Sequence, residues 1–223
     1  MNSNTPRPLP RRSACAACLR PQSACICRWI TLVAHPVEVL ILQHPLEVDH
    51  PKGSARLLHL SLPRSRLVTG EVFDLAALLG APLAGGGLAC NVLLYPDTPH
   101  DQAPDLLPDL SPPALDPALL HNPARLRLVV LDGTWRKSRK MLYANPLLQQ
   151  LPRLALQDTG TSHYLIRKAH RPGQLSTLEA TCAALAALHG GPQGLQPLLD
   201  AFDGFVAQQM GYRPRPELSP PLR

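Results

Sequence analysis

Short apolar runs alternate with helix-like segments along most of the chain. Residues 37–43, 66–69, 90–95 and 128–131 consist largely of Leu, Val and Ile and carry few charges. Runs of this length and composition predict strands that are buried on both faces of a sheet. Another short strand is predicted at residues 153–157.

Helical periodicity is strongest near the C-terminus. In residues 176–189, Leu178, Cys182, Leu185 and Ala186 lie at positions i, i+4, i+7 and i+8. This spacing predicts an amphipathic helix, and residues 195–210 show a similar apolar face. Weaker patterns predict helices at residues 53–62 and 73–79. Because strands alternate with helices, the sequence predicts an α/β fold with a largely parallel sheet.

The central stretch, residues 126–142, joins a predicted strand to a helix that starts near Thr134. Between them lies Asp132-Gly133-Thr134-Trp135. The carboxyl end of a strand is where open α/β sheets bind ligands, so we expect the chemistry here. A simpler interpretation is equally open. Asp132 would only cap the helix, Gly133 would only permit the turn, and Trp135 would only fill the core.

The helix after this turn starts with four cations in five residues: Arg136, Lys137, Arg139 and Lys140. The positive end of the helix dipole makes them locally unfavourable. A nearby polyanion would compensate, although a solvated run of charges explains the pattern too.

Two other polar segments have a structural and a functional interpretation. Ser176 followed by Glu179 is the capping-box pattern, which leaves Thr177 unexplained. The segment from His44 to Glu47 follows a predicted strand, and it is either a turn fixed by Pro45 or an edge of the site. The turn is the simpler interpretation.

Four of the six cysteines fall within thirteen residues, in the pattern C-x2-C-x6-C-x-C: Cys15, Cys18, Cys25 and Cys27. Two close pairs of thiolates predict a closed, structural Zn²⁺ site, because soft sulfur ligands prefer zinc to magnesium or calcium. Free or redox-active thiols are the alternative. Cys90 and Cys182 lie at core positions and are expected to be inert.

Composition narrows the class of protein. The net charge of +6 modestly favours an anionic partner such as nucleic acid. The sequence contains no apolar run of 18 residues and no secretory signal, so we expect a cytoplasmic protein without a membrane span. Residues 96–123 are rich in Pro and Asp and predict a loop. We expect a disordered tail at 1–13, a zinc knuckle at 14–30, a catalytic domain at 31–213 and a tail at 214–223.

Several ordered motifs resemble the DTW domain family, which is named for the pattern Asp-x-Thr-Trp. The other blocks are Cys15-x2-Cys18-x-Arg20-Pro21 with Cys25-x-Cys27, Gln43-His44-Pro45-x-Glu47, Tyr95-Pro96, Lys137 with Arg139-Lys140-Met141, Tyr164-x2-Arg167-Lys168, and residues 175–180. The bacterial tRNA-uridine aminocarboxypropyltransferase branch is the nearest fit. The long Pro/Asp-rich stretch before Leu126 departs from the family pattern.

The resemblance implies a SPOUT-like fold, with helices on both faces of a mostly parallel sheet and a C-terminal knot that binds S-adenosylmethionine. It also implies transfer of the 3-amino-3-carboxypropyl group from this co-substrate to N3 of a tRNA uridine. Methylthioadenosine is then the by-product.

Residue roles follow as hypotheses. Asp132 is the candidate base or orienter, because N3 of uridine is a weak acid, with Thr134 holding it and Trp135 stacking on a base. The predicted cofactor-binding residues are Leu131, Gly133, Tyr164, Ser176, Thr177 and Glu179. The predicted phosphate contacts are Arg136, Lys137, Arg139, Lys140, Arg167 and Lys168. The rival functions are an S-adenosylmethionine-dependent RNA methyltransferase and a non-enzymatic zinc-knuckle RNA-binding protein.

Overall fold

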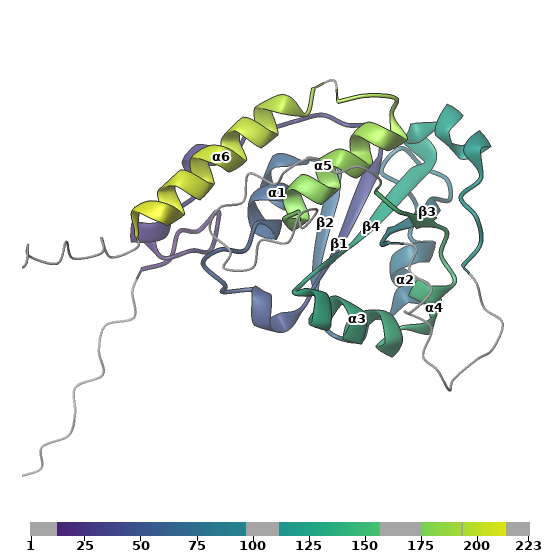
Figure 1. Ribbon diagram of the computed structural model, residues 1–223, viewed down its shortest axis with the longest axis horizontal. Coiled ribbons are helices and arrows are strands. Elements are labelled where there is room, and N and C mark those ends of the chain that lie inside the picture. Colours follow the sequence, from purple (N-terminus) through teal and green to yellow (C-terminus); the bar gives the residue numbers. More distant parts are fainter. Residues whose placement is uncertain (1–12, 97–111, 157–174, 193, 213–223) are drawn as a thin grey trace, which may run out of the picture.

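Five parallel strands form one sheet in the order β2-β1-β4-β3-β5 (Figure 1). The computed structural model describes residues 13–96, 112–156, 175–192 and 194–212. The strands are β1 (Glu38–Gln43), β2 (Ser65–Thr69), β3 (Cys90–Leu94), β4 (Leu126–Asp132) and β5 (Arg153–Leu154). Strands form at all five predicted places, but β4 begins at Leu126 rather than Leu128, and β5 covers only Arg153 and Leu154 of the predicted residues 153–157.

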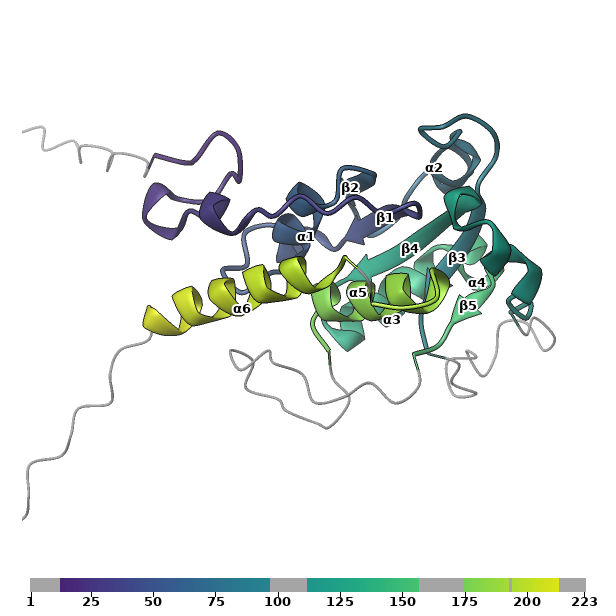
Figure 2. The same cartoon turned by 90° about the horizontal axis from the view of Figure 1, so that it is seen from above.

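Helices pack on both faces of this sheet, and Figure 2 shows α5 and α6 along the same side. One face is covered by α1 (Ala55–Ser61), α5 (Thr177–Leu188) and α6 (Gln196–Gly211), and the other by α2 (Leu75–Gly80), α3 (Trp135–Ala144) and α4 (Pro146–Gln149). The short 3₁₀ helices are η1 (Gln22–Ala24), η2 (Cys27–Trp29), η3 (Pro45–Glu47), η5 (Pro117–His121) and η6 (Pro123–Arg125).

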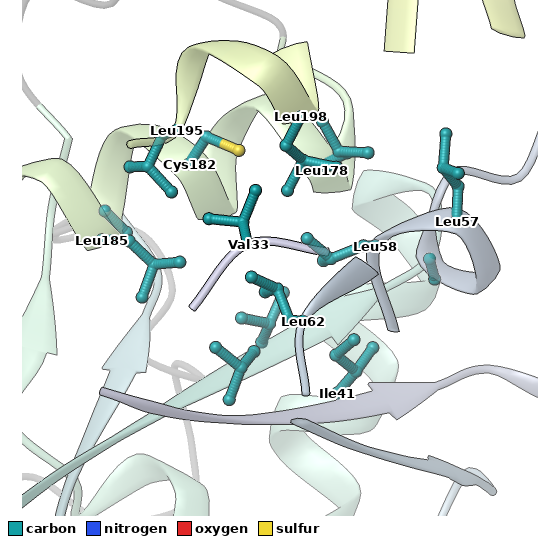
Figure 3. Packing of buried hydrophobic residues seen from close by; sticks show 14 of the residues in the cluster. Val33, Ile41, Leu57, Leu58, Leu62, Leu178, Cys182, Leu185, Leu195 and Leu198 are labelled. Carbon is teal, nitrogen blue, oxygen red and sulfur yellow. The ribbon is translucent and has the colours of Figure 1, made fainter. Parts of the chain in front are cut away.

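The two-sided cover explains why the strand sequences are apolar throughout. Side chains alternate between the faces of a strand. In β4, Leu128 and Val130 join the core beneath α1, α5 and α6, whereas Val129 and Leu131 join the core beneath α2, α3 and α4. Figure 3 shows the first of these cores, where Ile41 lies close to the side chains of the α1 segment.

The chain leaves the two central strands in opposite directions. From β1 it passes through α1 to β2, and from β4 it passes through α3 and α4, on the other face, to β5. At such a switch point, open α/β sheets bind ligands in a crevice outside the carboxyl ends of the two strands, so we expect the site there. In the register of this pair, Gln43 lies opposite Asp132, 89 residues away in the sequence.

Three predicted site residues, Tyr164, Arg167 and Lys168, lie outside the described residues, as does most of the segment between β5 and α5, residues 157–174, on which a knot would depend. Among the helices that the structure describes, none has the length and apolar character needed to cross a membrane.

Candidate functional site at the switch point

The Asp132 carboxylate lies at the end of β4 and is held from two sides. The Gln43 amide donates from Nε2 to Oδ2 over 2.9 Å, and the Thr177 hydroxyl donates to Oδ1 over 2.7 Å. These donors come from β1 and from the first residue of α5, so three distant parts of the chain meet here. Only 4% of Asp132 is exposed. A carboxylate bonded on both oxygens is fixed in one orientation, as a reacting or ligand-orienting group must be.

The cap of α3 is Thr134 and not Asp132. Thr134 occupies the N-cap position, and its hydroxyl accepts a hydrogen bond from the Lys137 backbone N–H at 3.4 Å. The interpretation of Asp132 as only a helix cap is therefore wrong. Gln43 and Thr177 both donate hydrogen bonds to the Asp132 carboxylate, and a holding role for Thr134 stays a prediction.

Gly133 is needed because two other segments approach the turn closely. A Cβ at this position would lie 3.1 Å from Cβ of Lys137 and 3.7 Å from Cβ of His44. The first distance is tighter than ordinary carbon contacts, so a larger residue would require Lys137 to shift by a few tenths of an ångström. Gly133 thus lets the first turn of α3 and the loop after β1 lie close together beside Asp132.

Trp135 does not fill the core. Half of its surface, 50%, is exposed, and its ring stacks on Tyr95 with centroids 5.2 Å apart and planes 19° from parallel. Tyr95 is buried at the end of β3, and the Arg153 guanidinium lies over its ring at 5.3 Å. A half-exposed indole on a buried, fixed ring forms a rigid platform beside the crevice.

His44 and Glu71 join the loops after β1 and β2. His44 Nδ1 accepts from the Leu46 backbone N–H at 3.1 Å, which places the imidazole hydrogen on Nε2, 2.8 Å from Glu71 Oε1. Glu71 Oε2 accepts from Lys140 Nζ at 2.5 Å, and this hydrogen bond lowers the pKa of Glu71. His44, Glu71 and Lys140 thus connect the loops after β1 and β2 to each other and to α3.

Glu47 forms a second link to the same helix. Its carboxylate, with a side chain only 5% exposed, lies 2.7 Å from Lys137 Nζ. Because Glu47 ends η3, the segment from His44 to Glu47 is both the predicted turn and an edge of the site. The two interpretations of this segment are therefore compatible.

The capping box at the start of α5 is confirmed. Ser176 Oγ accepts from the Glu179 backbone N–H at 3.1 Å, and Glu179 Oε2 accepts from the Ser176 backbone N–H at 2.8 Å. Thr177, which the capping box leaves unexplained, is the residue that reaches Asp132. Leu131 is 9% exposed in the sheet. Contact of these residues and Gly133 with a cofactor stays a prediction.

Sequence reasoning assigned no role to Gln43, Glu71 or Asn145. Asn145 Nδ2 donates to the Glu71 carbonyl at 2.8 Å, and its Oδ1 accepts from the Phe73 backbone N–H at 3.0 Å. These bonds fasten the loop after β2 to the end of α3. A signal existed for Gln43, because it is the polar residue that closes an apolar strand, as Asp132 is.

The four clustered cysteines come together as predicted. Their Sγ atoms all lie within 4.8 Å of one another, and the Cys15–Cys27 and Cys18–Cys25 separations are 3.5 and 3.8 Å. Ligands at the Zn–S length of about 2.3 Å on a tetrahedron lie about 3.8 Å apart. Backbone N–H groups of Cys18 and Ala17 lower the pKa of Cys15 to about 6, and the hydrogen bond with Cys15 raises the pKa of Cys27 to about 12, so the pair favours one thiolate. The donor set therefore fits zinc.

The segment that carries the four cysteines is held in place by contacts with other parts of the protein. Arg20 donates to the carbonyls of Pro51 and Gly53 at 2.6 and 2.8 Å. Trp29 packs so closely on α6 that a Cβ on Gly204 would lie 2.1 Å from its ring. In Figures 1 and 2 the N-terminal segment runs beside α6. The cluster thus joins the two ends of the described chain.

We expect a zinc chelator to lower the melting temperature and to weaken the packing of Trp29 on α6, because the metal–sulfur bonds that hold this segment together are lost. Metal analysis and thermal melting, with and without chelator, check this. Cys18→Ser should lose zinc, whereas the matched control Cys90→Ser, outside the cluster, should retain it. Retention of zinc by Cys18→Ser would contradict the assignment.

Together the fold and the site define an α/β protein with a polar candidate site at the switch point of a parallel sheet and an N-terminal four-cysteine cluster. The profile of the DTW domain matches residues 12–210. The chain belongs to the DTW domain family, which confirms the resemblance seen in its motifs.

Three relatives carry the same kind of name. The chain is similar to tRNA-uridine aminocarboxypropyltransferase 2 of Drosophila melanogaster, with 31% identity over 85% of this chain and 72% of the relative. It is 26% identical to tRNA-uridine aminocarboxypropyltransferase 2 of Macaca fascicularis, over 95% of the chain and 68% of the relative. It is 27% identical to tRNA-uridine aminocarboxypropyltransferase A of Arabidopsis thaliana, over 93% and 86%. No solved structure matches the chain.

Proposed function

We propose that this protein transfers the 3-amino-3-carboxypropyl group of S-adenosylmethionine to N3 of a tRNA uridine and releases methylthioadenosine. The observation that carries the proposal is the doubly held Asp132 in the switch-point crevice of a DTW-family chain. The names of three relatives supply the reaction. The fixed carboxylate supports a group that acts on a proton or orients a substrate.

The reaction needs a proton acceptor and strict positioning. A bond forms between N3 and the substrate carbon as the bond from that carbon to sulfur breaks, and the sulfonium becomes a neutral thioether. The N3 proton must leave, and we assign its removal, or the orientation of N3, to Asp132. Since the sulfonium carries three carbons, placement of N3 next to one of them decides which group moves.

The assignments around Asp132 extend this proposal. The co-substrate lies against Leu131, Gly133 and the start of α5 at Ser176, Thr177 and Glu179, together with Tyr164. Support comes from the hydrogen bond of Thr177 to Asp132, which puts the start of α5 at the crevice. Zn²⁺ bound by the four cysteines has a structural role, in which it holds the N-terminal segment together, and it takes no part in the transfer. We also propose that the fold is SPOUT-like with a C-terminal knot. The proposed location of the protein is the cytoplasm.

Incubation of the purified protein with unmodified tRNA and S-adenosylmethionine tests the reaction. We expect mass spectrometry of the digested tRNA to show a uridine carrying an aminocarboxypropyl group, with methylthioadenosine in the supernatant. A methylated nucleoside with adenosylhomocysteine would establish a methyltransferase instead. Salt-sensitive tRNA binding without either product, whatever the co-substrate concentration, would establish a binding protein.

A further inference from the structure

Arg20 lies within the four-cysteine segment, and its backbone is part of the turn that carries the first two cysteines. Its carbonyl accepts a hydrogen bond from the Cys15 backbone N–H at 2.8 Å. The preceding residue, Leu19, has a φ of 60°, in the left-handed region that tight turns use. The place of the Arg20 side chain therefore depends on how the cysteine segment is folded.

The Arg20 guanidinium fastens this segment to the residues just before α1. Its Nη1 donates to the Pro51 carbonyl at 2.6 Å, and its Nη2 donates to the Gly53 carbonyl at 2.8 Å. The same group lies over the ring of Phe205, a fully buried residue of α6, at 5.2 Å. Because the guanidinium is a planar fork, two bonds to two carbonyls define one orientation. Residues 51–53 are therefore held relative to the cysteine segment.

Ser54 comes next in the chain and joins these residues to α5. It is buried and directly precedes α1, and its Oγ accepts a hydrogen bond from the Leu178 backbone N–H at 3.3 Å. The first N–H groups of a helix have no acceptor within that helix, so Ser54 satisfies one of them from 124 residues away. Ser176 satisfies another through the capping box. The start of α5 is thus held from α1 as well as by its own cap.

The neighbour of Leu178 in this first turn is Thr177, whose hydroxyl donates to Asp132 Oδ1 over 2.7 Å. Since the two residues are adjacent in one helical turn, a shift of Leu178 also moves Thr177. A displacement of about 1 Å at a reacting site can lower a rate by roughly 10²-fold. The geometry at Asp132 therefore depends on Ser54, and on Arg20, which holds the residues that lead into Ser54.

We propose that Arg20 is a positioning residue, which connects the cysteine cluster through residues 51–54 and Leu178 to the contact between Thr177 and Asp132. The inference rests on the proposed function for the reaction that is affected. The connection itself is a chain of hydrogen bonds, so it can be measured without the reaction. It gives the arginine that follows the first cysteine pair a role beyond the metal site.

Hydrogen exchange of the Leu178 amide, measured by NMR on the zinc-loaded full chain, tests the connection. Arg20→Met and Ser54→Ala should each speed this exchange several-fold relative to Leu185, later in the same helix, because the acceptor of Leu178 is displaced or removed. Arg20→Lys, which offers a point charge in place of a fork, should have an intermediate effect. Arg28→Met removes the same charge from an exposed position of the same segment and, as the matched control, should leave the exchange unchanged.

Two outcomes of this measurement would overturn the proposal. One is unchanged exchange at Leu178 in Arg20→Met. The other is loss of zinc from this variant, found by metal analysis, because Arg20 would then hold the cluster rather than the start of α5. If Arg20→Met fails to fold, Arg20→Lys and the smaller change Ser54→Ala decide the same question.

Single-turnover transfer then relates the connection to the reaction. Arg20→Met should lower the rate about 10-fold, with tRNA affinity and its salt dependence unchanged. It should cause little further loss in a Thr177→Val background, because both changes act through one contact. Losses that multiply independently would overturn the route through Thr177, and weaker, less salt-dependent tRNA binding would make Arg20 a phosphate contact and overturn the proposal too. Absence of transfer by the wild-type protein would refute the proposed function, whereas exchange at Leu178 would still decide what Arg20 holds.

Discussion

Asp132→Asn is expected to lower the transfer rate by about 10²–10⁴-fold, the contribution of a positioned acid or base, while the protein stays folded. The substitution removes the negative charge and replaces one acceptor oxygen with an NH₂ donor. That NH₂ group would face the amide of Gln43 or the hydroxyl of Thr177, which now donate to the two carboxylate oxygens. Single-turnover measurement at saturating co-substrate gives the rate, and near-wild-type activity would refute the assignment.

The pH profile of the same variant separates a base from an orienter. If Asp132 accepts the N3 proton, the remaining activity of Asp132→Asn should rise with pH, because hydroxide then takes the proton from this weak acid. If Asp132 only orients the uridine, the variant and the wild type should have parallel profiles.

Thr177 provides the matched control for this experiment. Thr177→Val keeps the volume and removes the hydroxyl that donates to Oδ1 over 2.7 Å, so Asp132 retains its charge but loses one fixed contact. We expect an intermediate loss of rate, recovered in Thr177→Ser, which restores the hydroxyl. A loss that Thr177→Ser does not recover would point to the shape of the site rather than to the hydrogen bond.

Arg127→Met is expected to lower the free energy of unfolding by about 3–5 kcal/mol, the usual effect of breaking a buried ion pair. Arg127 is fully buried in β4, and its Nε lies 2.6 Å from Glu38 Oε1 on the neighbouring strand. Its other nitrogens donate to the carbonyls of Leu78, Leu79 and Ala81, at the end of α2. Methionine would leave both the carboxylate and these carbonyls without their donor.

Urea denaturation of a double-mutant cycle measures this effect. The double variant Glu38→Met with Arg127→Met should recover part of the loss, because it removes the isolated charge, though not the unmet carbonyls. A change below about 1 kcal/mol in Arg127→Met, within the range of surface ion pairs, would contradict the role assigned to this pair.

The strands and most helices were predictable because their signals are local. An apolar run such as residues 128–131 reports burial on both faces, and the spacing of Leu178 and Cys182 reports a helix face. The capping box at Ser176 and Glu179 is also local, since both partners lie within one turn. The 3₁₀ helices and the four-residue α4 were missed because segments this short do not show a helical periodicity in the sequence.

The order of the strands in the sheet and the register of their pairing were not predictable from local signals. Which strands are neighbours depends on the packing of helices on the two faces, and no short window contains that information. The pairing of β1 with β4 brings Gln43 to Asp132 across 89 residues. The buried pair of Arg127 and Glu38 arises from the same register, although both residues look like surface charges in the sequence.

The sequence by itself determined the strands, most α-helices, the cysteine cluster with ligands suited to zinc, and a candidate site after the strand that ends at Asp132. These follow from spacing within short segments, and the resemblance to the family follows from the order of its motifs along the chain. Only the tertiary structure decided that Asp132 is a held carboxylate rather than a cap, that Trp135 is half exposed, and that Lys137 and Lys140 pair with Glu47 and Glu71. Each of these depends on partners from distant segments, which only the packed sheet and helices bring within hydrogen-bonding distance.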